Sequence, residues 1–420
     1  MIQTAQLRTI ATCLSVTVFV ASALSQPRYD FILVDSLNAN PLAGEAYVWD
    51  INDVGMACGV ATVDNVPGYP GIVWTEADGR VRISVATPRC VNNLGLVVGI
   101  GDILDLASNT IYTPPNLPGT YYAPSFGGVN DAGVAVGTIS GCSCSDSGGV
   151  LQVPYIWDAV NGARTISVPN ARGLSRINEA GIAIGWLNGW VMNDGFIIDI
   201  NTGVYTILAD VFPTSIGSGP IHAADINDSG VVAGSRAGIY PVYRHGFTYS
   251  PETGVQFLPF PGTGYQQYVR PTAINNAGQV VGVISTTTAS QHVFVYSDAD
   301  GLLDLNVGTM IDGLPAGYRL YAATEINNAG WIAGYGHTAQ GKITGFVLKA
   351  RGIVRGDSNC DGVVNNFDID PFVLALTSPD DYTASFPNCD LLNADINLDG
   401  AVNNFDIDPF VACLANSGCQ

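Results

Sequence analysis

Short apolar segments alternate with polar, glycine-containing turns along most of this 420-residue chain. The segments are rich in β-branched residues, which favours short β-strands joined by tight turns. One pattern, an Ile or Val followed by Asn-x-x-Gly-x-x-x-Gly, recurs seven times at intervals of 38 to 52 residues. The lead asparagines are Asn52, Asn92, Asn130, Asn178, Asn227, Asn275 and Asn327.

Each copy of this pattern predicts a β-hairpin. The apolar residue ends one strand, and the Asn with the polar residue after it caps the turn. The first Gly supplies the positive φ that the turn needs, and apolar residues then resume the return strand. We expect the second Gly to mark a crowded position or a bulge.

A second, looser strand–turn–strand unit follows most of these hairpins. "GIVWTEADGRVRIS" from Gly71 and "HVFVYSDADGLLDL" from His292 are examples, and the copy around residues 102–113 is degenerate. Two hairpins give four strands in about 40–50 residues, the size of a propeller blade. We therefore expect an all-β, seven-bladed β-propeller in residues 26–352. A linear β-array and two packed sheets are the alternatives.

The two ends of the repeat region favour a closed ring. The last repeat has no clear fourth strand, and the segment "YDFILVDSL", Tyr29–Leu37, resembles the missing one. We expect it to complete the blade that begins near Glu325. An open array would leave edge strands exposed at both ends.

The repeats resemble the bacterial extracellular HAF-repeat family. In that family an A-[IL]-N-x-x-G-x-[VI]-x-G segment precedes an H-A-F-[LVR]-[WY] segment. Here "HGFTY" and "HVFVY" carry the second segment, and "GIVW", "YIW" and "GFVL" match it more weakly. The resemblance covers roughly residues 30–350. It implies a secreted, propeller-like module and no established reaction.

The charge of the chain is concentrated at its end. The net charge is −20, and residues 356–420 contain eleven Asp and no Lys, Arg or Glu. No run of basic residues is present in the sequence, which argues against a nucleic-acid partner.

Residues 1–25 are predicted to be a signal peptide. Arg8 is followed by an apolar run at residues 10–24 and by small residues, with cleavage after Ala23 or Ser25. The run is short for a membrane span. A membrane anchor is the alternative. We expect a secreted or cell-surface monomer without a membrane span in the mature chain.

An exported chain with an even number of cysteines is expected to form disulfides. Eight cysteines remain once Cys13 is removed with the signal peptide. Proximity in the sequence suggests the pairs Cys58–Cys90, Cys360–Cys389 and Cys413–Cys419, with Cys142 and Cys144 left over.

The end of the chain contains two near-copies of an acidic loop, "GDSNCDGVVNNFDIDPF" and "ADINLDGAVNNFDIDPF", 38 residues apart. Each fits a twelve-residue calcium loop, which supplies oxygen ligands from alternate positions and needs Gly at its sharp turn. The sequence predicts two Ca²⁺ ions. The ligands are Asp357, Asn359, Asp361, Val363, Asn365 and Asp368 in the first loop, and Asp395, Asn397, Asp399, Ala401, Asn403 and Asp406 in the second, with Val363 and Ala401 using their main-chain oxygens.

Residues 356–420 resemble a type I dockerin. The loops end in Asp instead of Glu, and an apolar helix is expected after each, with Pro371 and Pro409 in its first turn. Dockerins bind cohesin modules of scaffold or surface proteins, so the resemblance implies a cohesin-like partner. It places the contacts at Asn366, Phe367, Val373 and Leu374, and at Asn404, Phe405, Val411 and Ala412.

Two features leave that assignment open. Many dockerins carry Ser/Thr pairs where this chain has Asn-Phe. In a module this small, Phe367, Val373, Leu374 and their copies could instead form the core, which is the interpretation we favour for the phenylalanine pair.

No catalytic motif stands out in the sequence. There is no G-x-S-x-G, no H-E-x-x-H and no phosphate-binding loop, and His245 and His292 share one slot of the repeated strand. The carboxylates Asp50, Asp225 and Glu325 precede hairpin turns and are weak candidates for a glycosidase pair.

We therefore expect a secreted calcium-binding protein that is not an enzyme. Its propeller would bind an extracellular ligand, with polysaccharide as one candidate, and its tail would dock to a partner. An extracellular carbohydrate-active enzyme (a glycoside hydrolase or lyase) and a structural cell-surface component are the alternatives.

Overall fold

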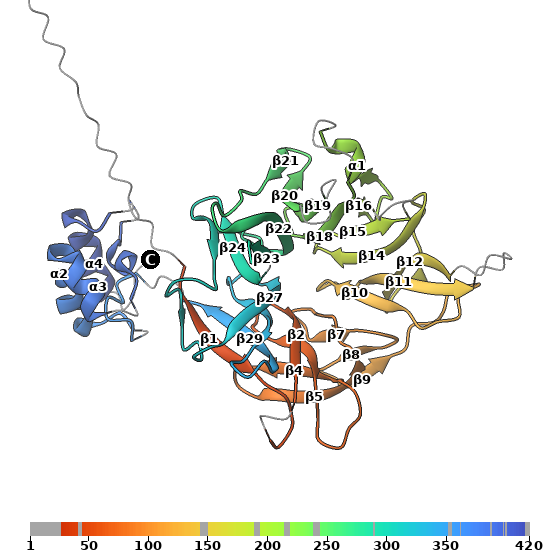
Figure 1. Cartoon of the computed structure of the whole chain (residues 1–420), viewed down its shortest axis with the longest axis horizontal. Helices are drawn as coiled ribbons and strands as arrows, with labels where there is room; N and C mark the ends of the chain where they lie inside the picture. The colour runs from red at the N-terminus through yellow and green to blue at the C-terminus, as the bar shows by residue number, and fades with distance from the viewer. Residues whose placement is uncertain are drawn as a thin grey trace, which may run out of the picture. The chain divides into compact units, whose positions relative to one another are not determined.

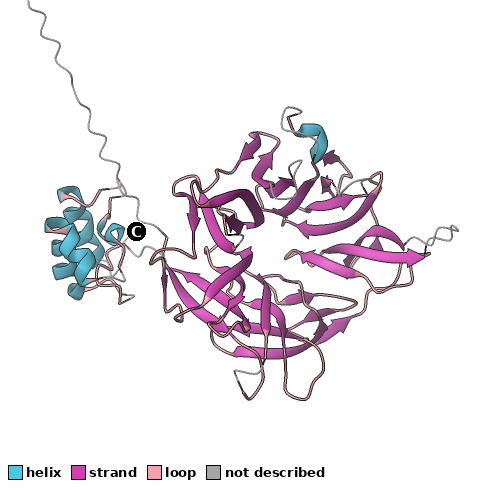
Figure 2. Ribbon diagram, in the orientation of Figure 1, coloured by secondary structure: helices cyan, strands magenta, loops and turns pink. Residues whose placement is uncertain are grey.

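The structure is a computed structural model that describes residues 27–40, 44–142, 150–188, 194–213, 219–237, 244–288, 290–351, 355–361, 363–386, 389–397, 399 and 401–415. The predicted signal peptide lies outside the described residues. The chain divides into two compact units, of which one spans Gln26–Arg351 and the other contains Gly352–Gln420. Figure 2 shows that the larger unit is built of strands and the smaller one of helices.

The larger unit consists of small antiparallel sheets that follow one another around a ring (Figure 1). The first four sheets contain β2 (Ala46–Ile51), β3 (Ala57–Ala61), β4 (Pro70–Thr75) and β5 (Gly79–Ala86); β6 (Cys90–Val91), β7 (Leu96–Val98), β8 (Ile103–Asp105) and β9 (Thr110–Tyr112); β10 (Ser125–Val129), β11 (Ala135–Cys142), β12 (Val150–Asp158) and β13 (Gly162–Arg164); and β14 (Ala171–Ile177), β15 (Ile182–Leu187), β16 (Gly195–Asp199) and β17 (Tyr205–Ile207).

Two further sets of four strands follow the short helix α1 (Leu208–Val211). A single parallel bridge between Arg244 and Tyr268 joins them into one eight-stranded sheet. The sets are β18 (Ile221–Ile226), β19 (Val232–Ala237), β20 (Arg244–Ser250) and β21 (Gly254–Phe257), and β22 (Tyr265–Ile274), β23 (Val280–Thr286), β24 (Gln291–Ser297) and β25 (Gly301–Asp304).

The last sheet joins the two ends of the repeat region. It contains β26 (Ile311–Asp312), β27 (Arg319–Ile326), β28 (Ile332–His337), β29 (Ile343–Ala350) and the N-terminal strand β1 (Tyr29–Val34). Strand β1 pairs antiparallel with β29 over its whole length. The prediction that Tyr29–Leu37 completes the sheet begun near Glu325 is confirmed, and the terminal edge that an open array would expose is paired.

Each repeated hairpin forms as its sequence predicts. The first Gly of every copy has a φ of 75° to 81°, the left-handed region that other residues avoid. The side-chain oxygen of the lead Asn accepts a hydrogen bond from the main-chain nitrogen four residues later, at 2.8–3.0 Å. The asparagine therefore caps its own turn.

The second Gly of the pattern lies at a crowded position, as expected. A Cβ atom added to Gly334 would lie 2.1 Å from the main-chain oxygen of Ala322 and 2.6 Å from the ring of Phe346. Phe346 is fully buried, as are Phe196, Phe247 and Phe294, which occupy the same slot of other repeats. In these four sheets the missing side chain makes room for the phenylalanine that fills the core.

The first strand of most sheets contains a one-residue bulge. In β2, for example, Val48 pairs with Gly59 and Asp50 pairs with Cys58, so that Trp49 is the extra residue. A bulge bends the strand and can redirect a side chain. The extra residues are Trp49, Gly127, Ser175, Ala224, Thr272 and Thr324.

Side chains of the lead asparagines join the hairpins into a closed circle. The amide nitrogen of each lead Asn donates to the main-chain oxygen of the lead Asn in the next hairpin, at 2.8–3.2 Å. The series runs from Asn52 around the ring and returns from Asn327 to Asn52. All seven asparagines are buried. This closed circle of small sheets is a β-propeller fold.

The smaller unit contains α2 (Ile369–Thr377), α3 (Pro379–Ser385) and α4 (Ile407–Ala415), with short 3-10 turns η2 (Asn366–Asp368), η3 (Leu391–Ala394) and η4 (Asn404–Asp406). Each acidic loop leads into a helix that begins two residues before its proline, as predicted. The rings of Phe372 and Phe410, which occupy the same position in the two copies, stack at 3.9 Å in the core.

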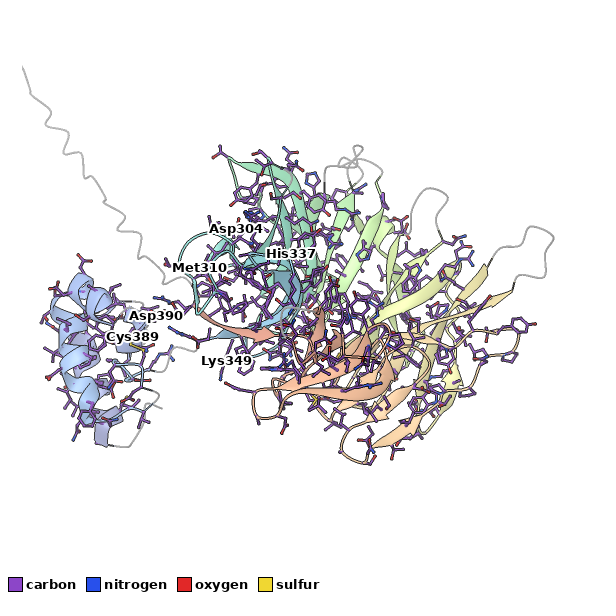
Figure 3. The ribbon with its side chains drawn as sticks, turned by 60° about the horizontal axis from the view of Figure 1, so that its bottom comes forward. Asp304, Met310, His337, Lys349, Cys389 and Asp390 are labelled. Atoms are coloured by element: carbon purple, nitrogen blue, oxygen red, sulfur yellow. A yellow bond between two sulfur atoms is a disulfide. The ribbon has the colours of Figure 1, made fainter. Side chains whose placement is uncertain are left out.

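Cysteine pairing is predicted correctly in one case and wrongly in another. Cys360 and Cys389 form a disulfide in the smaller unit, where Figure 3 labels Cys389. Cys58 and Cys90 are free thiols, so that pair was wrong. Their side chains belong to different core clusters of neighbouring sheets. Cys144 and Cys419 lie outside the described residues.

Candidate functional site

The two acidic loops are organised around their last residue. Asp368 is fully buried and accepts hydrogen bonds from the main-chain nitrogens of Asn359 and Asn365, at 3.0 and 2.8 Å. Asp406 does the same for Asn397 and Asn403, at 3.0 and 2.8 Å. The carboxylate at position twelve thus ties the start of each loop to its end.

The remaining predicted ligands lie along the same curved loops. In the first loop Asp357 is buried and accepts from the main-chain nitrogen of Asp361, and Asp361 accepts from Val363. In the second loop Asn397 accepts from Asp399, and Asp399 accepts from Ala401. Each loop therefore brings together only oxygen ligands of the kind that calcium prefers.

The oxygen atoms of these residues fit a hard cation in chemistry. Within the described residues, no three His, Cys, Asp or Glu side chains are close enough to hold a metal ion. Gly362 and Gly400, the predicted turn residues, lie outside the described residues. No Lys or Arg occurs in residues 356–420 to balance the carboxylates.

The predicted contact residues are mostly exposed. The exposed fraction is 79% for Phe367 and 77% for Phe405, so the expectation that these rings form the core was wrong. The core uses Phe372 and Phe410 instead, five residues further along each copy. The other exposed residues are Asn366, Val373, Asn404, Val411 and Ala412, whereas Leu374 packs partly against the core.

A second candidate site lies on the axis of the ring. A cavity of about 720 Å³ is lined by residues of every sheet, including the six bulge residues and Arg89. Arg89 precedes β6, the strand without a bulge, and occupies the same place relative to its lead Asn. The bulges therefore bring one residue from each repeat to the wall of a common cavity.

In each repeat, the residue directly after the bulge position contributes to a narrow neck below this cavity. Here Arg176 faces three buried carboxylates, of Asp50, Asp225 and Glu325. Nε of Arg176 lies 3.7 Å from Oδ1 of Asp225, and Nη2 lies 3.4 Å from Oε2 of Glu325. Nη1 donates to the main-chain oxygen of Gly127. The three carboxylates that were weak catalytic candidates are thus brought together, around a cation that sequence reasoning missed.

Burial determines the protonation of this cluster. It raises the pKa of Asp225 to about 6, because Arg176 offsets only part of the desolvation. Burial and the nearby Asp225 and Asp50 raise the pKa of Glu325 well above its usual value. Burial disfavours the charge of Arg176, but Glu325 and Asp225 outweigh it and raise the pKa of the guanidinium.

Two of the carboxylates also link neighbouring sheets. Oδ2 of Asp50 accepts from the main-chain nitrogen of Val91 at 2.6 Å, and Oδ2 of Asp225 accepts from Ile274 at 2.9 Å. These bonds give the acids a structural role at the neck.

The opposite end of the axis is acidic. There, the residue after each lead Asn links two hairpins. Its side-chain oxygen accepts a hydrogen bond from the main-chain nitrogen of the corresponding residue in the preceding hairpin, at 2.8–3.0 Å. The residues are Asp53, Asn93, Asp131, Glu179, Asp228, Asn276 and Asn328. A smaller cavity of about 150 Å³ lies at this end.

The wide cavity is rich in arginine. Arg89, Arg176, Arg244 and Arg270 line it, although the whole chain has only 16 Lys and Arg. No Asp or Glu is among the described residues of its wall. A signal for this site exists in the sequence. When the seven repeats are aligned, the two residues before the Ile or Val that precedes the lead Asn vary (Trp-Asp, Arg-Cys, Gly-Gly, Ser-Arg, Ala-Asp, Thr-Ala, Thr-Glu), while the Ile or Val and the Asn after them recur in every copy.

The histidines lie away from any nucleophile motif. Nδ1 of His292 lies 2.6 Å from Oδ2 of Asp304, and His245 packs against Phe257 and Phe260. His292 and His337 line a separate cavity of about 1020 Å³ beside β24 and β27 (Figure 3 labels Asp304 and His337).

None of the helices in the described part of the chain has the length and the apolar character needed to cross a membrane.

Comparison with known proteins shows similarity of fold only. No family model matches the sequence, and no curated protein matches it. Among solved structures, TolB from Acinetobacter baumannii is 12% identical with a TM-score of 0.38, over 62% of this chain and 63% of TolB. An acylaminoacyl peptidase from Pyrococcus horikoshii is 11% identical with a TM-score of 0.46, over 73% of this chain and 52% of the peptidase.

A third solved structure is the β-propeller domain of the trilobed protease from Pyrococcus furiosus. It is 11% identical with a TM-score of 0.40, over 74% of this chain and 85% of that domain. The chain thus spans about half the length of the peptidase and under two thirds of TolB. Similarity at this level carries no argument about activity.

Proposed function

We propose that this is an exported binding protein made of a seven-bladed β-propeller and a calcium-dependent docking module of dockerin type. The propeller binds an extracellular ligand, and the tail attaches the protein to a cohesin-like partner. The observation that carries the docking role is the pair of exposed phenylalanines, Phe367 and Phe405, at equal positions beside two acidic loops.

The closed circle of seven asparagines supports seven blades. Each lead Asn begins one hairpin, and the hydrogen bond from Asn327 to Asn52 completes the circle. When the two sets of strands joined by the Arg244–Tyr268 bridge are counted as separate blades, the described strands form six four-stranded units and one five-stranded unit, in which the short β26 pairs with β1.

Calcium would be held by the loop oxygens already described. Eleven carboxylates without a basic residue repel one another, and a divalent ion supplies the missing positive charge. The buried carboxylates Asp368 and Asp406 are costly to keep charged without such a partner.

Docking would use the face next to the loops. Phe367 with Val373, and Phe405 with Val411, leave apolar side chains exposed on the first turns of α2 and α4 and on the turns before them. Exposed aromatic side chains are the usual anchors of protein interfaces. The duplication gives the module two equivalent faces.

The neck of the ring favours binding over catalysis. A glycosidase needs two carboxyl groups that reach the sugar. Asp50 and Asp225 are instead bound to main-chain nitrogens, and Asp225 and Glu325 face Arg176. Carboxylates with such bonds suit a structural role at the base of the cavity better than the roles of general acid and nucleophile.

The docking proposal is tested with the full chain and purified type I cohesin modules as probes, by calorimetry in calcium and in chelator. We expect binding only in calcium, and we expect the double variant Phe367→Ala/Phe405→Ala to lose most of it. Tyr121→Ala, which removes a 67% exposed ring from the propeller, is the matched control and should bind normally. Calcium-independent binding, or full binding by the double variant, contradicts the proposed interface.

A further inference from the structure

The wall of the axial cavity has an excess of positive charge. Residues 26–351 contain 25 acidic and 14 basic residues, yet four of those arginines meet in this cavity. Arg176 is neutralised by the acids of the neck. Among the described residues, no ion pair involves Arg89, Arg244 or Arg270. Three guanidinium groups therefore have no carboxylate partner in the part of the chain that the structure describes.

Three threonine hydroxyl groups of the cavity are already used. The hydroxyl of Thr138 donates to the main-chain oxygen of Arg172 at 2.8 Å. Thr272 and Thr324 donate in the same way to Ala323 and Val48 of the next sheet, at 2.9 and 3.1 Å. These three hydroxyl protons tie the sheets together, and the arginines supply the charged hydrogen-bond donors that remain for a ligand.

Two further observations agree with a positive potential in the cavity. His222 is accessible from the cavity, and burial together with Arg244 and Arg270 lowers its pKa. The Nε atom of Arg270 is buried and has no hydrogen-bond partner among the described residues. A buried, unpaired guanidinium nitrogen is costly unless a ligand or water satisfies it.

Aromatic rings form one side of the cavity. The ring of Trp49, the bulge residue of β2, stacks on Tyr47 at 5.4 Å and lies 5.7 Å from Tyr335. The guanidinium of Arg89 lies 5.6 Å from the centre of the Trp49 ring, which holds both side chains in place. The volume of about 720 Å³ is far larger than a simple inorganic anion requires and falls in the range of sites for small organic molecules.

We propose that the axial cavity binds a negatively charged saccharide, through a carboxylate or sulfate group held by Arg244 and Arg270. Guanidinium groups match the planar or forked oxygens of both anions. The aromatic side, with Trp49 and Tyr335, packs against the apolar face of a sugar ring. This inference rests on the proposed role of the propeller as a binding module and is independent of the docking tail.

The experiment measures binding to the full chain by calorimetry, with oligogalacturonates as carboxylated probes, sulfated galactan oligosaccharides as sulfated probes and neutral galactan oligosaccharides as controls. We expect at least one acidic probe to bind about tenfold more tightly than the neutral one. Raising the salt concentration from about 50 to about 300 mM should weaken that binding. The two acidic probes distinguish a carboxylate from a sulfate ligand.

Arginine variants connect the binding to this cavity. Arg244→Gln and Arg270→Gln should each weaken the acidic probe by about tenfold. Arg82→Gln, which removes an exposed arginine from β5, should leave it unchanged. The tryptophan-fluorescence melting curve of each variant checks that the ring is folded. If Arg270→Gln does not fold, Arg89→Gln replaces it, because that side chain is exposed.

Each outcome has a distinct meaning. If neutral and acidic probes bind equally well and the arginine variants do not change this, the proposal of an anionic ligand is overturned. The proposal that the propeller is a binding module then stands. Binding of no saccharide at all overturns this inference and removes its support from the binding role of the propeller, while calcium-dependent docking stands on its own test.

Discussion

The side-chain nitrogen of Asn327 donates a hydrogen bond to the main-chain oxygen of Asn52, 2.9 Å away and 275 residues earlier in the chain. The oxygen of the same Asn327 side chain accepts from Trp331 at 2.8 Å. One residue therefore caps its own turn and closes the ring. Because every lead Asn has both roles, the repeat motif encodes the local hairpin and the contact between sheets together.

Replacing Asn327 should destabilise the ring. Asn327→Ala removes one buried and one partly buried hydrogen bond and leaves the oxygen of Asn52 with Gly55 as its donor, so we expect the free energy of unfolding to fall by about 2–4 kcal/mol. Asn328→Ala removes only exposed partners and should cost less than about 1 kcal/mol. Urea unfolding followed by tryptophan fluorescence measures both, since all six tryptophans precede residue 352. Equal losses in the two variants would show that the buried circle has no special role.

Removing calcium should unfold the tail and leave the ring intact. Chelator is expected to reduce the helical circular dichroism of α2, α3 and α4, because the uncompensated carboxylates then repel one another. Tryptophan fluorescence should not change. The substitution Asp368→Asn should mimic chelation in the first loop, whereas Asp380→Asn on the exposed surface of α3 should not. An unchanged helical circular dichroism signal in chelator would falsify the prediction that these loops bind calcium.

The buried acid Asp225 should make part of the stability of the ring depend on pH. Its pKa is raised to about 6, so the folded chain holds this proton more tightly than the unfolded chain. The stabilisation is present below about pH 4 and is lost as the pH rises through about 6. Glu325 acts in the same direction, while His222 and His245, whose pKa values are lowered, act in the opposite one.

A comparison of variants isolates this effect. Asp225→Asn keeps an oxygen that can accept from Ile274 and cannot ionise. Its melting temperature relative to the parent should therefore improve between about pH 4.5 and about pH 7.5. Asp210→Asn, at an exposed position of α1, should follow the parent at every pH. If the difference in melting temperature between Asp225→Asn and the parent is the same at every pH, the raised pKa of Asp225 is contradicted.

The thiols of Cys58 and Cys90 should be unreactive in the folded protein. Both are buried, and burial together with the nearby Asp50 raises the pKa of each thiol well above its usual value. Since the thiolate is the reactive form, alkylation should label these residues only in denaturant. Peptide mapping by mass spectrometry, before and after unfolding, measures this. Recovery of a Cys58–Cys90 linked peptide from the native protein would contradict the free thiols.

Much of the fold could be predicted from the sequence because its instructions are local. The turn asparagine, the positive-φ glycine and the crowded second glycine each act within a few residues, and each behaves as expected. The pairing of Tyr29–Val34 with the last repeat was also predictable, because a sheet with a missing strand needs a partner. The exposed positions of Phe367 and Phe405 were not, since either of two phenylalanines per copy could have filled the small core.

The sequence by itself determined the repeat, the hairpins, the closing strand and the spacing of the oxygen-bearing side chains in the two acidic loops. Only the tertiary structure decided what the repeats place on their common axis. Arg176 and Glu325 are 149 residues apart in the chain, and Arg89 and Arg270 belong to different sheets. Ring closure and the bulges bring such residues together, and no local pattern of apolar and polar positions encodes that meeting.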